Sequence, residues 1–177
     1  MKRKSIKISL LFAFLLIIGF STLTKVNFLD YDAPISYDRI NDIGFENFKG
    51  LEFFQKSLYG NKSFAYIKTS IEVEFEDDSI RIESFFHPSS SYVYNKKAYS
   101  EDLLTHEMYH FKITELYARI AKKRISELKK KNKNDIEDLI SQVKSEERRY
   151  QIEYDDDTFH SYVLSEQKKY EKTIDSL

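Results

Sequence analysis

The feature that most constrains this chain is the stretch His106-Glu107-Met108-Tyr109-His110, which follows the pattern H-E-x-x-H. On an α-helix, residues four positions apart lie about 40° apart around the axis. The two histidines would therefore stand one turn apart on the same side, where both imidazoles can reach one metal ion with Glu107 beside them. The pattern has this meaning only on a helix, so the neighbouring sequence must build one.

The flanking residues predict that helix. Ser100 is a favourable N-cap, and Glu101 and Asp102 follow in the first turn, where the helix dipole favours acidic side chains. No Gly or Pro interrupts the stretch up to Leu128. Apolar residues recur on one face at helical spacing, namely Leu103, Leu104, Phe111, Leu116, Ile120, Ile125 and Leu128.

Two runs before this helix predict an antiparallel hairpin. Residues 64–75 alternate apolar and polar side chains from Lys68 on, and residues 80–85 alternate again after a polar turn at 76–79. Tyr92–Tyr94 could add a short third strand. The chain has only 4 Gly and 2 Pro, which leaves few tight turns and favours long helices over a many-stranded sandwich.

Two more helices are expected after the first. A polar break covers residues 129–134, and a second helix then starts at Asn134 or Asp135 and runs to about Tyr154. The acidic run Asp155–Thr158 interrupts it, and a last helix covers about His160–Ile174. We therefore expect an α+β fold, with a small antiparallel sheet packed on a long H-E-x-x-H helix and two further C-terminal helices.

The first 25 residues are typical of a segment for export. Basic residues at positions 2–4 precede the apolar run Ile8–Phe20, which suits a signal-peptide core better than a full membrane span of about 20 residues. No A-x-A cleavage site follows, so both a cleaved signal peptide and a retained membrane anchor remain open. Residues 26–177 are expected to form one domain outside the cytoplasm.

Composition narrows the classes of function. Hydrophobic residues make up 41% and charged residues 32%, a globular balance. Cysteine is absent, which excludes a disulfide framework, a thiol nucleophile and cysteine-bound zinc. Residues 1–25 carry basic side chains and no acidic ones, so the rest of the chain is net acidic. A nucleic-acid partner is not expected, because phosphate binding needs clustered positive charge.

A catalytic zinc ion takes three protein ligands and keeps one position for water. The motif supplies two ligands, and the candidates for the third are His160, His87 and the carboxylates. Glu115 lies about 180° from His106 around the helix and faces away. We favour His160, which follows the acidic run at the predicted start of the last helix.

Two longer motifs carry a family resemblance. The first is His106-Glu107-x-x-His110-Phe111-x-Ile113-x-Glu115-Leu116-Tyr117-Ala118-Arg119, and the second is Tyr154-Asp155-x-x-Thr158-x-His160. Together they resemble a bacterial family regarded as secreted zinc-dependent proteases, the domain of unknown function nine hundred and twenty-two. Upstream similarities such as Asn47-Phe48-Lys49-Gly50 extend the resemblance to roughly residues 45–175. Ser161 departs from the family, which usually has Gly at this position.

The resemblance implies a zincin-like domain that binds Zn²⁺ and cleaves a peptide or protein substrate. His106 and His110 would be zinc ligands, and Glu107 would act as the general base on a zinc-activated water. The alternative is an exported binding or assembly module that holds a metal without turnover, and the small size of the domain favours it.

The second motif is implied to lie near the metal. His160 would either ligate zinc or stabilise the oxyanion, and Tyr154 could donate a hydrogen bond to the same oxyanion. Thr158 and Asp155 would stand behind the ligands. Asp155 would accept a hydrogen bond that orients a histidine, or else form an exposed acidic turn that caps the next helix.

Overall fold

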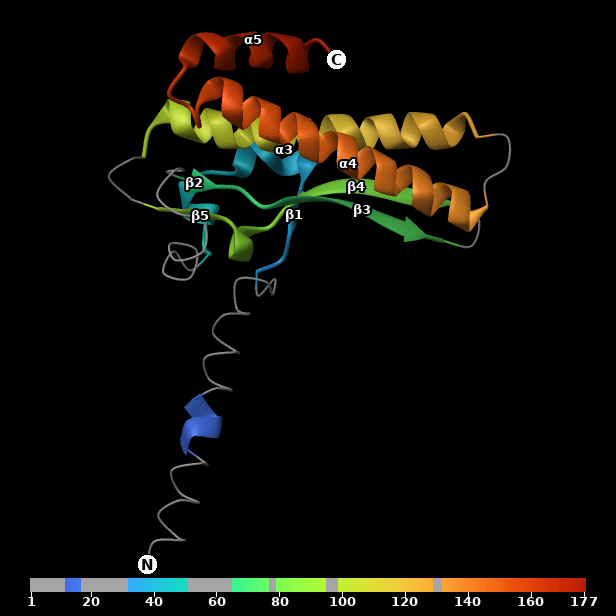
Figure 1. Cartoon of the computed structure of the whole chain (residues 1–177), viewed down its shortest axis with the longest axis horizontal. Helices are drawn as coiled ribbons and strands as arrows, with labels where there is room; N and C mark the ends of the chain where they lie inside the picture. The colour runs from blue at the N-terminus through green and yellow to red at the C-terminus, as the bar shows by residue number, and fades with distance from the viewer. Residues whose placement is uncertain (1–11, 17–31, 51–64, 77–78, 95–98, 129–131) are drawn as a thin grey trace, which may run out of the picture.

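The computed structural model of the chain describes residues 12–16, 32–50, 65–76, 79–94, 99–128 and 132–177. Figure 1 shows a layer of long helices lying over small antiparallel sheets. The fold is therefore α+β, as the sequence predicts. The chain also forms short 3₁₀ helices at Tyr37–Asp42, Phe45–Asn47 and Pro88–Ser90.

The larger sheet has three antiparallel strands in the order β1-β4-β3. Strands β3 (Thr69–Phe75) and β4 (Ile80–Phe86) form the predicted hairpin, in which Val73 lies opposite Ile82. Strand β1 (Ile35–Ser36) pairs with the other edge of β4. The alternating pattern predicted this hairpin because its apolar side chains face the helices.

A second sheet has two strands, β2 (Ala65–Tyr66) and β5 (Tyr92–Val93). The short strand predicted at Tyr92–Tyr94 is confirmed, but it pairs with β2 and not with the hairpin. Ile67 separates β2 from β3 because its side chain packs into a core cluster with Phe86 and Phe111.

Helix α3 (Glu101–Ser126) packs across the sheets and carries the H-E-x-x-H motif. Its predicted N-cap is confirmed, since the Leu103 N–H donates to Ser100 Oγ at 3.1 Å. The largest apolar cluster lies between the hairpin, α3 and the next helix. It consists of Ile71, Ile82, Ala118, Ala121, Ile125, Ile136, Ile140 and Val143.

Helix α4 (Lys133–Thr158) lies beside α3, and α5 (Leu164–Asp175) packs against both (Figure 1). The predicted end of the second helix near Tyr154 is wrong, because α4 continues through the acidic run to Thr158. Two carboxylates of this run, those of Asp155 and Asp157, have hydrogen-bond partners that offset the unfavourable helix dipole. One example is Asp157, which accepts a hydrogen bond from Tyr170 at 2.7 Å.

The last helix begins at Leu164, four residues later than predicted. Before it, Phe159, His160 and Ser161 have φ angles of 47°, 52° and 75°. These values lie in the left-handed region, which non-glycine residues seldom adopt. His160 therefore lies in a left-handed turn between α4 and α5, not on the predicted helix.

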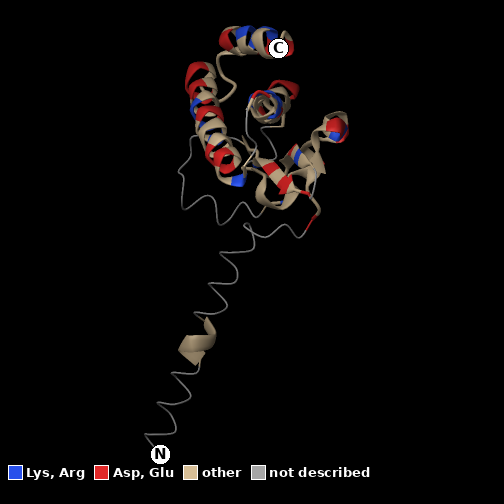
Figure 2. Ribbon diagram, turned by 90° about the vertical axis from the view of Figure 1, so that its right-hand side faces the viewer, with Lys and Arg blue, Asp and Glu red and all other residues tan. Residues whose placement is uncertain are grey.

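Figure 2 shows basic and acidic residues intermingled along the helices. Within the described ranges, no helix has the length and apolarity needed to cross a membrane. Of the predicted export segment 1–25, only residues 12–16 lie in the described part of the chain.

Candidate metal-binding site

The two histidines of the motif meet on the side of α3 that faces α4. Their Nε2 atoms are 3.2 Å apart, and their rings contact edge to face with centroids separated by 4.8 Å. His106 is 1% exposed and His110 is 9% exposed. The one-turn spacing thus brings two buried imidazole nitrogens to one point.

Asp155, near the end of α4, lies between three histidines. Its Oδ1 atom is 3.2 Å from His106 Nε2, 3.1 Å from His110 Nε2 and 3.0 Å from His160 Nδ1. One ligand atom each from His106, Asp155 and His160 lie within 4.8 Å of one another. This group could hold a metal ion, and His110 Nε2 borders it.

Four of the separations in this group are close to the spacing of neighbouring ligands around a tetrahedral metal ion. Zinc binds histidine nitrogen at about 2.0–2.1 Å, which places neighbouring ligand atoms roughly 3.3 Å apart. The four contacts among His106, His110, Asp155 and His160 measure 3.0–3.2 Å. Imidazole nitrogen and carboxylate oxygen are donors that suit divalent transition-metal ions.

Burial and hydrogen bonding shift the pKa values of the side chains in this group in different directions. Burial lowers the pKa of His106 to about 4. Burial also acts to lower the pKa of His110, but the Asp155 carboxylate outweighs it and raises that pKa to about 9. The positive charge on a protonated His110 also acts to lower the pKa of His106, because two charged imidazoles at this separation repel. Burial alone would raise the pKa of Asp155, but its histidine partners hold it well below the usual range.

Glu107 is buried beside this group, with 4% of its surface exposed. Burial raises the pKa of its carboxyl group to about 7, although a hydrogen bond from the Ile67 main chain favours the charged form. A carboxyl group with a pKa near 7 can accept and release a proton near neutral pH.

The left-handed turn holds His160 against Asp155. The His160 main-chain N–H donates to the Asp155 carbonyl at 3.1 Å, and the Val163 N–H donates to the Thr158 carbonyl at 2.9 Å. The side chains of His160 and Asp155 are 31% and 32% exposed. The group is therefore open to solvent at His160 and Asp155, whereas His106 and His110 are buried.

Tyr154 packs directly against the histidines, and Thr158 contacts Tyr154. The Tyr154 ring stacks on His106 with centroids 4.7 Å apart, and its hydroxyl donates to the His106 carbonyl at 3.4 Å. This side chain is fully buried, so its position fits packing better than the expected donation to an oxyanion. Thr158 Oγ1 donates to the Tyr154 carbonyl at 2.6 Å and reaches the histidines only through that residue.

The other candidates for a third ligand have partners elsewhere. His87, at the end of β4, shares a 2.7 Å hydrogen bond with Ser70 through its Nε2 atom. Glu115 accepts hydrogen bonds from Ser84 at 2.7 Å and from Arg119 at 2.8 Å. Neither belongs to the group of His106, Asp155 and His160.

Gln151, which the sequence analysis did not single out, also contacts the motif. Its Oε1 atom forms a short hydrogen bond with His110 Nδ1, and its Nε2 atom donates to the His110 carbonyl at 2.9 Å. Gln151 lies four residues before Asp155 and therefore on the same face of α4. That spacing is the sequence signal that could have revealed it.

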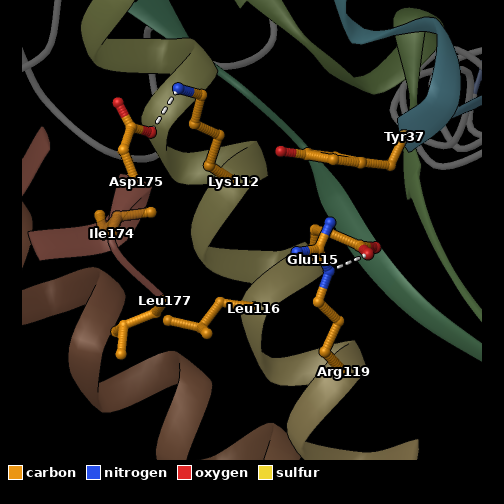
Figure 3. Close-up of a pocket in the computed structure, with 8 residues that line it drawn as sticks. All are labelled: Tyr37, Lys112, Glu115, Leu116, Arg119, Ile174, Asp175 and Leu177. Carbon is orange, nitrogen blue, oxygen red and sulfur yellow. Dashed lines mark hydrogen bonds and ion pairs between the residues drawn. The ribbon is translucent and has the colours of Figure 1, made fainter.

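A surface pocket of about 170 Å³ lies farther along α3, next to α5 (Figure 3). Its charged side chains pair with one another: Lys112 contacts Asp175 at 2.7 Å, and Arg119 contacts Glu115 at 2.8 Å. Because Glu115 faces away from His106 around the helix, this pocket is separate from the histidine group.

Residues 89–161 match a family described as a bacterial protein of unknown function (DUF922). The matched stretch includes the whole H-E-x-x-H motif, Asp155 and His160. The match confirms similarity to this family over a shorter stretch than residues 45–175, and the family description assigns no activity. No curated protein and no solved structure matches the chain.

Proposed function

We propose that this chain is an exported zinc-dependent metallopeptidase. One observation carries the proposal. His106 Nε2 and His110 Nε2 lie next to Asp155 and His160, and the buried Glu107 directly follows His106 in the sequence. This arrangement combines nitrogen and oxygen donors with a candidate proton acceptor. It is also compatible with a zincin-like domain, although the fold by itself does not imply an activity.

Each residue of the group would have a separate role. The histidines would hold the metal, with Asp155 either as a further ligand or as the acceptor that orients them. When bound, a divalent metal ion polarises a carbonyl and lowers the pKa of a water molecule. Glu107 would accept a proton from the attacking water and pass it to the leaving amine. The peptide would approach the metal from the side of Asp155 and His160, whose side chains are partly exposed.

A substitution of Glu107 tests this role. We expect Glu107→Gln to reduce peptide cleavage by about 10²- to 10⁴-fold while zinc remains bound, because the amide cannot accept the proton. The measurement is cleavage of a broad peptide library by the purified full chain, together with its zinc content. Glu101→Gln, an exposed position on the same helix, is the matched control. Undiminished cleavage by Glu107→Gln would remove this residue from the mechanism.

One observation favours a second candidate function, an exported module that holds a metal without turnover. Asp155 Oδ1 adds a fourth protein donor to three histidine nitrogens, and four protein ligands are typical of a closed structural zinc site. Stoichiometric zinc without cleavage of any library peptide would support this candidate. Cleavage that is abolished by a chelator and restored by zinc supports the peptidase.

The proposal also includes export by residues 1–25, either as a cleaved signal peptide or as a membrane anchor. A peptide or protein is the proposed partner, and a nucleic acid is not. Fractionation of cells that express the full chain tests this part, because recovery only in the cytoplasm would contradict it.

A further inference from the structure

The Gln151 side chain holds His110 at two places. Its Oε1 atom contacts the ring at Nδ1, and its Nε2 atom donates to the main-chain carbonyl of the same residue at 2.9 Å. The first contact fixes the rotation of the imidazole, and the second ties that ring to the main chain of α3. Gln151 therefore links α4 to α3 beside the motif.

The neighbours of Gln151 determine which way its amide points. Its Nε2 atom lies 2.9 Å from the His110 carbonyl, 3.0 Å from Glu147 Oε1 and 3.2 Å from Thr114 Oγ1. A carbonyl and a carboxylate oxygen can only accept hydrogen bonds, so the nitrogen must occupy this end. The opposite end, toward His110, is then the oxygen.

This orientation selects one form of the His110 ring. Because Gln151 Oε1 can only accept, His110 Nδ1 must carry a hydrogen atom. The lone pair of the neutral ring is then on Nε2, the atom that faces His106 and Asp155. Within the described residues, the corresponding Nδ1 atom of His106 is buried without a hydrogen-bond partner. The two motif histidines are therefore held in different ways.

We infer that Gln151 is a positioning residue that presents His110 Nε2 to a metal ion. The inference rests on the proposed metal site but not on peptide cleavage. A hydrogen bond to the second nitrogen of a ligand histidine fixes the tautomer and the ring orientation, and its loss lowers metal affinity about 10- to 100-fold.

The test measures the affinity of the purified full chain for Zn²⁺ by competition with a chromophoric chelator. We expect Gln151→Leu to bind zinc about 10- to 100-fold more weakly. Gln151→Glu should bind zinc more tightly than Gln151→Leu, because its carboxylate can still accept from His110 Nδ1, although it can no longer donate to the His110 carbonyl and Glu147.

Two controls separate positioning from damage to the fold. Thr114→Val removes a hydroxyl of the same hydrogen-bond network, which contacts Gln151, Glu147, Thr69 and the His110 main-chain carbonyl but not the His110 ring. We expect this variant to be less stable yet to bind zinc like the wild type. Gln142→Leu changes an exposed glutamine on the same helix and should have no effect on affinity.

The outcomes distinguish this inference from the proposed function. Wild-type affinity in Gln151→Leu, or an equal loss in Thr114→Val, overturns the positioning role and leaves the metal site standing. Absence of zinc binding by the wild-type chain overturns both. Zinc binding that depends on Gln151 without any cleavage supports the inference and contradicts only the peptidase.

Discussion

Three consecutive residues with positive φ place His160 in the candidate metal-binding group. A non-glycine residue in this region costs roughly 1–2 kcal/mol, because its Cβ approaches the following carbonyl oxygen. The turn is held by main-chain hydrogen bonds and by the contact between His160 and Asp155. Backbone strain of this kind is concentrated at functional sites, where neighbouring contacts enforce it.

Ser161, with a φ of 75°, gives a direct test of this strain. We expect Ser161→Gly to raise the free energy of unfolding by about 1 kcal/mol, since glycine adopts this conformation without the Cβ penalty. Urea unfolding of the full chain measures the change. Ser165→Gly, at an exposed position in α5, should instead lower stability by about 0.5–1 kcal/mol. A Ser161→Gly variant no more stable than the wild type contradicts the prediction.

Spacing alone could place His106, Glu107 and His110 together, because the helical period is fixed. The contact of Asp155 with both histidines could not be derived in this way. It depends on how α4 is aligned against α3, and that alignment is set by tertiary packing. The same holds for Gln151, whose partners His110 and Thr114 lie on α3 and whose partner Glu147 lies on its own helix.

At the scale of elements, α5 packs against Tyr154, the residue that stacks on His106. Ile174 packs in one cluster with Tyr109, Ile113 and Tyr154. Asp175 accepts hydrogen bonds from Tyr109 and Lys112, both at 2.7 Å, and Figure 3 shows the second contact. The end of α5 is thereby fixed to α3 next to the ring that stacks on His106.

Shortening Ile174 tests this support. We expect Ile174→Ala to destabilise the protein by about 2–5 kcal/mol, because it leaves a cavity in a buried cluster. Zinc affinity should fall as well, since Tyr154 would lose part of its packing. Thermal unfolding and chelator competition measure the two effects. Ile152→Ala changes a residue that is 51% exposed on α4 and should cost within about 0.5 kcal/mol. Equal effects of the two variants would show that α5 gives no support.

Elements with strong local signals were predictable, and those set by distant contacts were not. Helix α3 was predicted because a cap, acidic first-turn residues and an uninterrupted apolar face agree. The end of α4 was predicted wrongly because the acidic run Asp155–Thr158 looks unfavourable until its partners are known. Strand β5 has only two residues, too few for its pattern to select a partner.

At the scale of the whole molecule, the main core and the candidate metal-binding group are separate. The largest apolar cluster joins the hairpin to the C-terminal half of α3 through residues such as Ala121 and Ile125. The histidines lie in the N-terminal half of α3. We therefore expect the core to assemble without a metal ion, in contrast to zinc fingers, which unfold when zinc is removed.

We expect a chelator to remove zinc without loss of helix content, as measured by circular dichroism. The melting temperature should nevertheless fall, because a ligand that binds only the folded state stabilises it. The contribution is about 2.7 kcal/mol at a free concentration one hundred times Kd. Cooperative unfolding on chelation at room temperature would contradict the separation of core and site.

The single Asp155 oxygen that touches three histidines has a consequence for the rate of metal uptake. The donor atoms lie 3.0–3.2 Å from this oxygen, so we expect an ion to enter by rotation of side chains without movement of α3 or α4. Side-chain rotations of exposed groups take picoseconds to nanoseconds. We therefore expect stopped-flow mixing with Zn²⁺ to give one phase whose rate rises in proportion to zinc concentration, because encounter with the ion would be the slow step.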